Sequence, residues 1–145
     1  MKAPSRDDWG EIDRNDLDAN WAFKQFFGKS FEEAEAMFQS NALSYQEDLQ
    51  SMPAVVFNFY APALANYIVS SRAKGDSDGA SSFLHLLSWM LKARREVIFP
   101  KTEQLLLSAA EQIASRQDFY EAEADIYGKF SELHAQIQNL ASRGA

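Results

Sequence analysis

A short run of residues near the start of the chain resembles part of a phosphate-binding loop. Residues 28–30 read Gly-Lys-Ser, the last positions of that motif before its helix. The full motif also needs a glycine five positions before Gly28, because backbone amides must approach the phosphates closely, and it needs a preceding strand. Phe23 occupies that position, in a segment with helical spacing. We therefore expect no nucleotide binding by these residues.

A second motif has the spacing with which a lysine can assist a serine nucleophile. It is the run Ser-Arg-Ala-Lys at residues 71–74, and residues 77–79 and 101–103 echo the partner elements of penicillin-recognising enzymes. The first of these lies too close in sequence to come from a distant part of a fold, and the second lacks its glycine. A helix that ends in a polar loop explains these residues, so we predict no acyl-transfer site.

The residues that could bind a metal ion have unsuitable spacing. Asp76 and Asp78 begin like a calcium-binding loop, but Leu87 stands where the loop needs its final glutamate. A di-iron site in a helical bundle needs glutamate and histidine three residues apart, and neither His85 nor His134 has a glutamate there. We therefore expect no metal and no cofactor.

The remaining carboxylates lie in three groups, at residues 32–35, 47–48 and 121–125. Paired carboxylates act as acid and base only in a site that separates their pKa values. Charged residues at helical spacing are typical of a solvated helix face. Because the chain also has no cysteine and only two histidines, we predict no catalytic residues and favour a non-enzymatic protein.

Composition indicates one globular domain. The chain has 145 residues, of which 46% are hydrophobic and 24% are charged. The net charge of −7 disfavours binding to nucleic acid or to anionic membranes. The first residues lack the apolar core of a signal peptide, and the absence of cysteine is compatible with a reducing compartment. We therefore expect a cytoplasmic protein.

Apolar residues recur at helical spacing along almost the whole chain, and no strand is predicted. Ser30 and Glu33 form a capping box at the start of one helix. The predicted helices cover about 21–27, 31–49, the uncharged stretch 51–71, 80–98, 102–115, and a long final segment from Asp118. This pattern predicts an all-α protein, a compact bundle of five or six helices, with a short stack of helical pairs as the alternative.

The domain organisation follows from the same pattern. We expect a polar, acidic N-terminal arm over residues 1–20 and a single helical domain over residues 21–145. The loop over residues 74–79 (Lys-Gly-Asp-Ser-Asp-Gly) is too short to divide that domain.

The uncharged stretch 51–71 leaves hardly any polar face, so its helix must lie in a protein core or in a membrane. We favour the core, because the side chains of Asn58 and Asn66 would need partners in lipid. Pro62 lacks an amide hydrogen and clashes with the preceding turn. We therefore expect a kink or a break near residues 58–61.

The N-terminal arm contains a candidate partner-binding site. Trp9 and Ile12 lie among charged residues, and an exposed aromatic side chain ringed by charge has the composition of an interaction hot spot. The alternative is that these two residues pin the arm to the domain.

A second candidate surface is the polar face of the helix at 31–49. Glu32, Glu35 and Gln39 belong to it, as does Gln46, and residues 30–53 carry five acidic residues and no basic one. Such a face attracts a basic partner. We therefore predict a macromolecular interaction protein, with a protein partner or self-association, and an immunity-type inhibitor of a basic toxin as its most concrete version.

The competing prediction is a small-molecule-binding or catalytic bundle. Tyr60, Tyr67, His85 and Trp89 could supply an apolar pocket with a few polar groups. They could equally be core residues.

One part of the chain resembles a known group of proteins. The resemblance rests on residues 27–38 (FGKSFEEAEAMF), 45–49 (YQEDL) and 57–63 (FNFYAPA), together with Met52-Pro53 and Tyr67. These residues resemble a group of small bacterial proteins of uncharacterised activity. The resemblance covers about residues 20–72; it implies a bacterial source and carries no activity, ligand or site.

Overall fold

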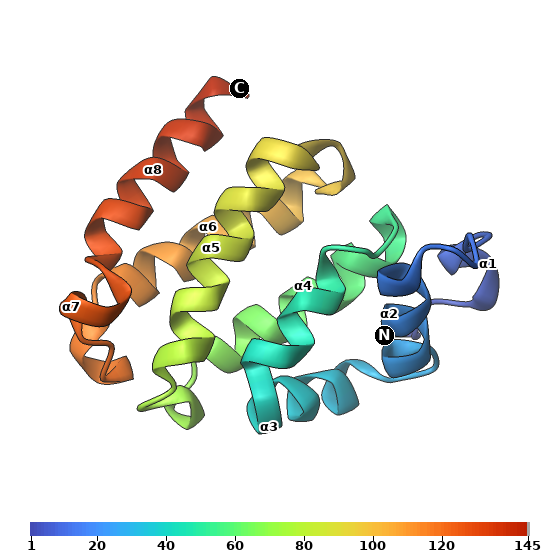
Figure 1. Cartoon of the computed structure of the whole chain (residues 1–145), viewed down its shortest axis with the longest axis horizontal. Helices are drawn as coiled ribbons and strands as arrows, with labels where there is room; N and C mark the ends of the chain where they lie inside the picture. Colours follow the sequence, from blue (N-terminus) through green and yellow to red (C-terminus); the bar gives the residue numbers. More distant parts are fainter. Residues whose placement is uncertain (145) are drawn as a thin grey trace.

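The computed structural model describes residues 1–144, and within them it shows an all-α bundle without strands. The α-helices are α1 (Arg6–Trp9), α2 (Leu17–Phe26), α3 (Phe31–Leu49), α4 (Ala54–Ile68), α5 (Ser77–Ala93), α6 (Pro100–Ala114), α7 (Ala124–Tyr127) and α8 (Phe130–Arg143). Three 3-10 helices join them, η1 (Ser71–Ala73), η2 (Arg95–Val97) and η3 (Gln117–Tyr120). Six of the α-helices have ten or more residues, which agrees with the predicted bundle of five or six helices. Figure 1 shows α1 and α2 at one end of the molecule and α8 at the other.

The uncharged stretch forms the central helix, as predicted. Helix α4 packs against α1, α3 and α6, and Val56, Tyr60 and Ile68 are fully buried within it. In the part of the chain that the structure describes, no helix is long and apolar enough to cross a membrane.

Pro62 does not break α4. Of the two outcomes that we expected near residues 58–61, a kink or a break, the break is therefore wrong. The helix continues from Ala54 to Ile68 with the proline inside it. The side chain of Asn58 donates to the carbonyl oxygens of Ala54 and Val97 and accepts from the amide of Phe99. Burial of the surrounding apolar side chains outweighs the loss of one backbone hydrogen bond.

Helix α3 begins with the predicted capping box and contains a bend that the sequence did not indicate. Ser30 and Glu33 bond reciprocally at its start. The backbone of Asn41 then leaves the helical range, and its side-chain oxygen accepts from the amide of Ser44 at 3.2 Å. Asn41 therefore caps the second half of α3 as an N-cap residue would.

The N-terminal arm packs on the domain. Trp9 ends α1 and is only 3% exposed, and its ring meets the ring of Phe23 edge-on with centroids 5.2 Å apart. Ile12 is half-buried. Because the indole is buried, Trp9 is not an exposed hot spot, and its role is the alternative one of pinning the arm. The boundary expected after residue 20 falls inside α2.

The prediction of one long helix from Asp118 onward is wrong. The chain forms η3 there, Glu121 adopts a left-handed conformation with φ of 55°, and Gly128 has φ of 77°. The side chain of Gln117 explains the interruption, because it donates to the carbonyl oxygens of Ala122 and Gly128 and accepts from the amide of Phe130. These bonds satisfy backbone groups that a continuous helix would otherwise have paired.

Arg95 fixes the far end of α8. Its guanidinium group binds both carboxylate oxygens of Glu103, at 3.1 and 3.0 Å. It also donates to the carbonyl oxygens of Leu140 and Ala141, each at 2.9 Å. Since the last carbonyl groups of a helix lack intrahelical donors, Arg95 acts as the cap that α8 needs.

Candidate functional site

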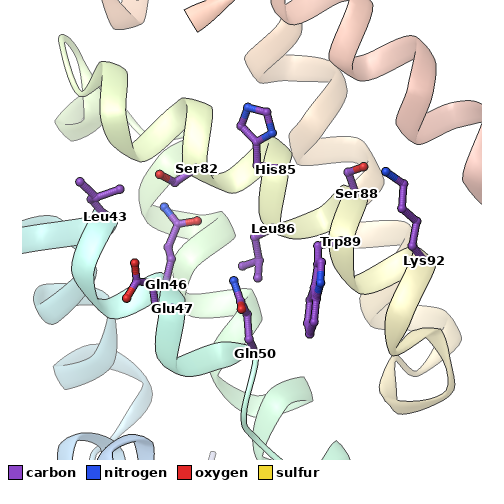
Figure 2. Close-up of a pocket in the computed structure, with 10 residues that line it drawn as sticks. All are labelled: Leu43, Gln46, Glu47, Gln50, Ser82, His85, Leu86, Ser88, Trp89 and Lys92. Atoms are coloured by element: carbon purple, nitrogen blue, oxygen red, sulfur yellow. The ribbon is translucent and has the colours of Figure 1, made fainter. Parts of the chain in front are cut away.

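A groove lies between α3 and α5, and Figure 2 shows its lining residues. It encloses about 450 Å³. Leu43 and Trp89 give it an apolar surface, with Trp89 40% exposed. Glu47 and Lys92 lie toward opposite ends of the view, so the groove carries a negative and a positive side chain at separate places.

Gln46 is the buried polar residue of this groove. It is 2% exposed, and its side-chain amide donates to the carbonyl oxygen of Gly79 at 2.9 Å. That bond fixes the orientation of the amide and leaves Oε1 without a partner. An unpaired buried polar atom costs about 1–3 kcal/mol. Trp9 Nε1 and Arg116 Nε are likewise buried without a partner, but of these three residues only Gln46 lines the groove, where a bound group can reach its oxygen.

A second pocket of about 250 Å³ adjoins the groove at the end of α3. Glu47 and Gln50 line both cavities. The second pocket also contains Trp21, which is 52% exposed, and the carboxylates of Asp18 and Asp48.

Asp48 is buried in unfavourable surroundings. It is 7% exposed, and the last turn of α3 contains no basic residue. Burial, together with the negative charges of Glu47 and Asp18, raises the pKa of Asp48 to about 6. The negative end of the helix dipole also disfavours a carboxylate at this position.

Two of the three tryptophans thus lie on neighbouring cavities. We call this region the two-tryptophan surface and define it by Asp18, Trp21, Leu43, Gln46, Glu47, Asp48, Gln50 and Trp89. It combines exposed indole rings with carboxylates, the side-chain types that bind cationic and aromatic groups.

The acidic face expected on α3 is largely used within the molecule. Glu35 pairs with Arg72 at 2.9 Å and accepts from the side-chain amide of Asn66. Gln39 accepts from the same guanidinium group at 3.0 Å. Glu32 is exposed. Two of the three residues therefore hold α3 against the end of α4 and η1.

The four residues expected to form one pocket do not converge. His85 and Trp89 line the α3–α5 groove, and Figure 2 shows the imidazole of His85 directed away from Gln46. Tyr60 is buried and donates to the carbonyl oxygens of Phe26 and Lys29, both at 2.8 Å. Burial raises the pKa of Tyr60 to about 12.

Tyr67, like Tyr60, uses its hydroxyl group in a hydrogen bond within the protein. Its hydroxyl group donates to Asp76 Oδ2 at 2.7 Å, and Asp76 also caps α5 by accepting from the amide of Gly79. Burial and the bond to Asp76 raise the pKa of Tyr67. Both tyrosines therefore tie loops to α4.

A third cavity provides a contrast. It lies between α4 and α6, encloses about 280 Å³, and is lined mainly by apolar side chains, including Val69 and Leu105. It has neither an ionisable side chain nor a buried polar atom without a partner among its lining residues.

Sequence reasoning missed Gln46 and Asp48, which it placed on solvated faces. Gln46 continues a spacing of four from Phe38 and Ala42, both buried, and this spacing is the one local signal for its burial. Asp48 has no such signal, because its burial depends on the turn that the chain makes toward α4.

Within residues 1–144, no group of three or more histidine, aspartate or glutamate side chains is placed to hold a metal ion. No protein-family model, curated protein or solved structure matches this chain.

Proposed function

We propose that this protein is a non-catalytic interaction module that binds a basic protein partner through the two-tryptophan surface. The observation that carries the proposal is the position of Trp21 and Trp89, which lie exposed in adjoining cavities that share Glu47 and Gln50. Tryptophan is the residue most enriched among binding hot spots, because its large ring buries much apolar area at low entropic cost.

Charge supports a basic partner. Asp18, Glu47 and Asp48 belong to the surface, and the whole chain carries a net charge of −7. Lys92 lines the far part of the groove, so the three carboxylates leave this region with an excess of negative charge, and such an excess accelerates the approach of a basic partner. An immunity-type inhibitor that covers the basic site of a toxin is the narrower version of the proposal.

The source and location that we propose are a bacterial cell and its cytoplasm. The resemblance of residues 20–72 to small bacterial proteins supports the first. The absence of cysteine is compatible with the second.

The test is affinity capture from the native cell with three forms of the protein: the natural sequence, Trp89→Ala and Leu105→Ala. Leu105 is a matched control because it is 45% exposed and lines the α4–α6 cavity. We expect a basic protein to be retained by the natural sequence and by Leu105→Ala. Trp89→Ala should weaken its binding by about tenfold or more, as for a hot-spot residue.

The same complex gives a test of the charge argument. Glu47→Lys should slow association and reduce its dependence on salt, whereas Glu132→Lys, on exposed α8 surface, should change neither by much. If every captured protein binds Trp89→Ala as tightly as it binds the natural sequence, the proposed function is wrong.

A second candidate function is the binding of a small molecule in the α3–α5 groove. The unpartnered Oε1 of Gln46 favours it, because a ligand with an N–H or O–H group could satisfy this buried acceptor. A ligand that raises the melting temperature of the natural protein, but not of Gln46→Leu, would support this function. A chain that captures its basic partner but gains no stability from any metabolite extract would exclude it.

A further inference from the structure

The pocket beside Trp21 holds a buried carboxylate that the fold does not neutralise. Asp48 forms no ion pair, since the ion pairs among residues 1–144 join Arg72 to Glu35 and Arg95 to Glu103. Arg94, the arginine at this end of α3, donates to the carbonyl oxygen of Gln50, and the charges that act on the carboxyl group of Asp48 are those of Glu47 and Asp18. Its neighbours in the pocket are two further carboxylates, Asp18 and Glu47, with neutral Ser44, Gln50 and Ser51.

This arrangement is unfavourable for folding alone. A buried charge is costly unless it is paired, and here the like charges of Glu47 and Asp18 add to the cost. An asparagine at position 48 would avoid that cost with the same shape. The carboxylate is therefore the feature of this pocket that calls for a ligand.

The pocket does not suit a metal ion. Metal coordination needs several ligand atoms at one point, and the described residues contain no group of three carboxylate or imidazole side chains placed in that way. Carboxylates spread around a cavity of about 250 Å³ match a larger cation, whose N–H groups point in several directions.

Trp21 adds an aromatic wall. Its ring already attracts one cation, because Lys24 Nζ lies 5.4 Å from the ring centroid. The ring is nevertheless 52% exposed and lines the pocket. Stacking on an indole and pairing with carboxylates are the two interactions that bind guanidinium and ammonium groups best.

We propose that the pocket formed by Asp18, Trp21, Glu47 and Asp48 binds an organic cation, a guanidinium or primary ammonium group that pairs with Asp48 and packs on Trp21. The cation comes either from a basic side chain of a protein or from a free polyamine. The proposal deepens the proposed function, because it names the chemical group that this part of the two-tryptophan surface binds, and where that group is a protein side chain it rests on the proposed function.

The probe is N-acetyl-argininamide, and its matched control is N-acetyl-citrullinamide, which has nearly the same shape without the charge. Binding is followed by NMR through the backbone amides of Glu47 and Asp48 and the indole N–H of Trp21. We expect the arginine probe to shift these signals with saturation and the citrulline probe to leave them unchanged.

Asp48→Asn should weaken binding of the arginine probe by about tenfold, the effect of losing a charge-assisted pair. Glu132→Gln, an exposed carboxylate on α8, should leave the affinity unchanged. The natural protein should also bind about tenfold more weakly at pH 5 than at about pH 7.5, because only a minor part of Asp48 is ionised at the lower pH. The pH comparison needs no variant and so holds even if Asp48→Asn fails to fold.

Two further probes distinguish the sources of the cation. Spermidine that binds at least tenfold more tightly than both N-acetyl-argininamide and N-acetyl-lysinamide indicates a free polyamine, and comparable or weaker binding indicates a protein side chain. Equal binding of the arginine and citrulline probes, or an affinity that Asp48→Asn and acid pH leave unchanged, would overturn the proposal. Capture through Trp89 with no response to any cation would also overturn it while leaving the proposed function intact.

Discussion

The two-tryptophan surface and the α8 end of the molecule differ in whether their polar and charged side chains have partners within the protein. At the α8 end, Arg95 donates to a carboxylate and to two backbone carbonyl groups, so its charge and hydrogen-bonding groups are used inside the protein. On the two-tryptophan surface, Asp48 has no cationic partner and Gln46 Oε1 has no donor.

This difference separates residues that stabilise the fold from residues that are free to bind. A polar group with all its partners inside the chain contributes to stability and offers little to a ligand. A buried polar group without a partner lowers stability and gains the most from a ligand that supplies one. The comparison predicts that substitutions at the two places change stability in opposite directions.

The largest effect is expected at Arg95. Arg95→Ala removes the cap of α8 and leaves the carboxylate of Glu103 half-buried without its partner, so the free energy of unfolding should fall by about 2–3 kcal/mol. Chemical denaturation measures the change, and hydrogen exchange should show it first in the last turn of α8. Arg143→Ala, an exposed residue of the same helix, should have little effect. Equal stability of the two variants would contradict the role of Arg95.

The next effect has the opposite sign. Asp48→Asn should raise the free energy of unfolding by about 1–2 kcal/mol at about pH 7.5, because it removes an uncompensated buried charge. The folded-state pKa of about 6 lies above the ordinary value of 3.8. The cost of the charge is therefore fully present above about pH 6, shrinks as the pH falls from there, and is lost only below pH 3.8, where the carboxyl group is protonated in both states.

The check for Asp48 is urea denaturation of both forms across that pH range. The advantage of Asp48→Asn should shrink as the pH falls, while Asp118→Asn, at an exposed position, should show no such trend. A constant difference at every pH would mean that the charge of Asp48 is not the cause.

A smaller effect is expected at Gln46. Gln46→Leu loses the bond to Gly79 but also removes the unpartnered Oε1, so the free energy of unfolding should change by less than about 1 kcal/mol. Asn58→Leu provides the comparison, because Asn58 makes three hydrogen bonds and its loss should cost clearly more. If Gln46→Leu lowers the free energy of unfolding as much as Asn58→Leu does, Gln46 is a residue that stabilises the fold and is not free to bind.

The smallest effect is expected at Trp89. The side chain is 40% exposed, so Trp89→Ala should lower the free energy of unfolding by only about 0.5–1 kcal/mol, in proportion to its partly buried area. The thermal transition should therefore stay close to that of the natural protein. A collapse of stability would show that Trp89 is a core residue rather than a binding residue.

Local signals predicted the parts of the fold that depend on neighbours in sequence. Ser30 and Glu33 define the start of α3 within four residues, and the uncharged stretch around Tyr60 has one stable environment, the core. The end of the chain behaved differently. Gln117 interrupts the expected helix through bonds to residues as far away as Phe130, and no short window of sequence contains that information.

The candidate site was predicted poorly for the same reason. Glu35 and Asp48 are both carboxylates on one helix, and only the packed structure shows that the first meets Arg72 while the second meets no cation. Trp9 and Trp21 present the same difficulty, because two aromatic residues near the N-terminus have opposite exposures in the folded chain.

The bend at Asn41 has a mechanical consequence for the surface that it precedes. Because Asn41 caps the residues that follow it, α3 consists of two rods that meet at one joint. The first rod is clamped by the pair between Glu35 and Arg72, and the second forms one wall of the α3–α5 groove. The second rod is joined to α5 by its own bond, from the side-chain amide of Gln46 to the carbonyl oxygen of Gly79, so the width of the groove is set separately from the clamp on the first rod.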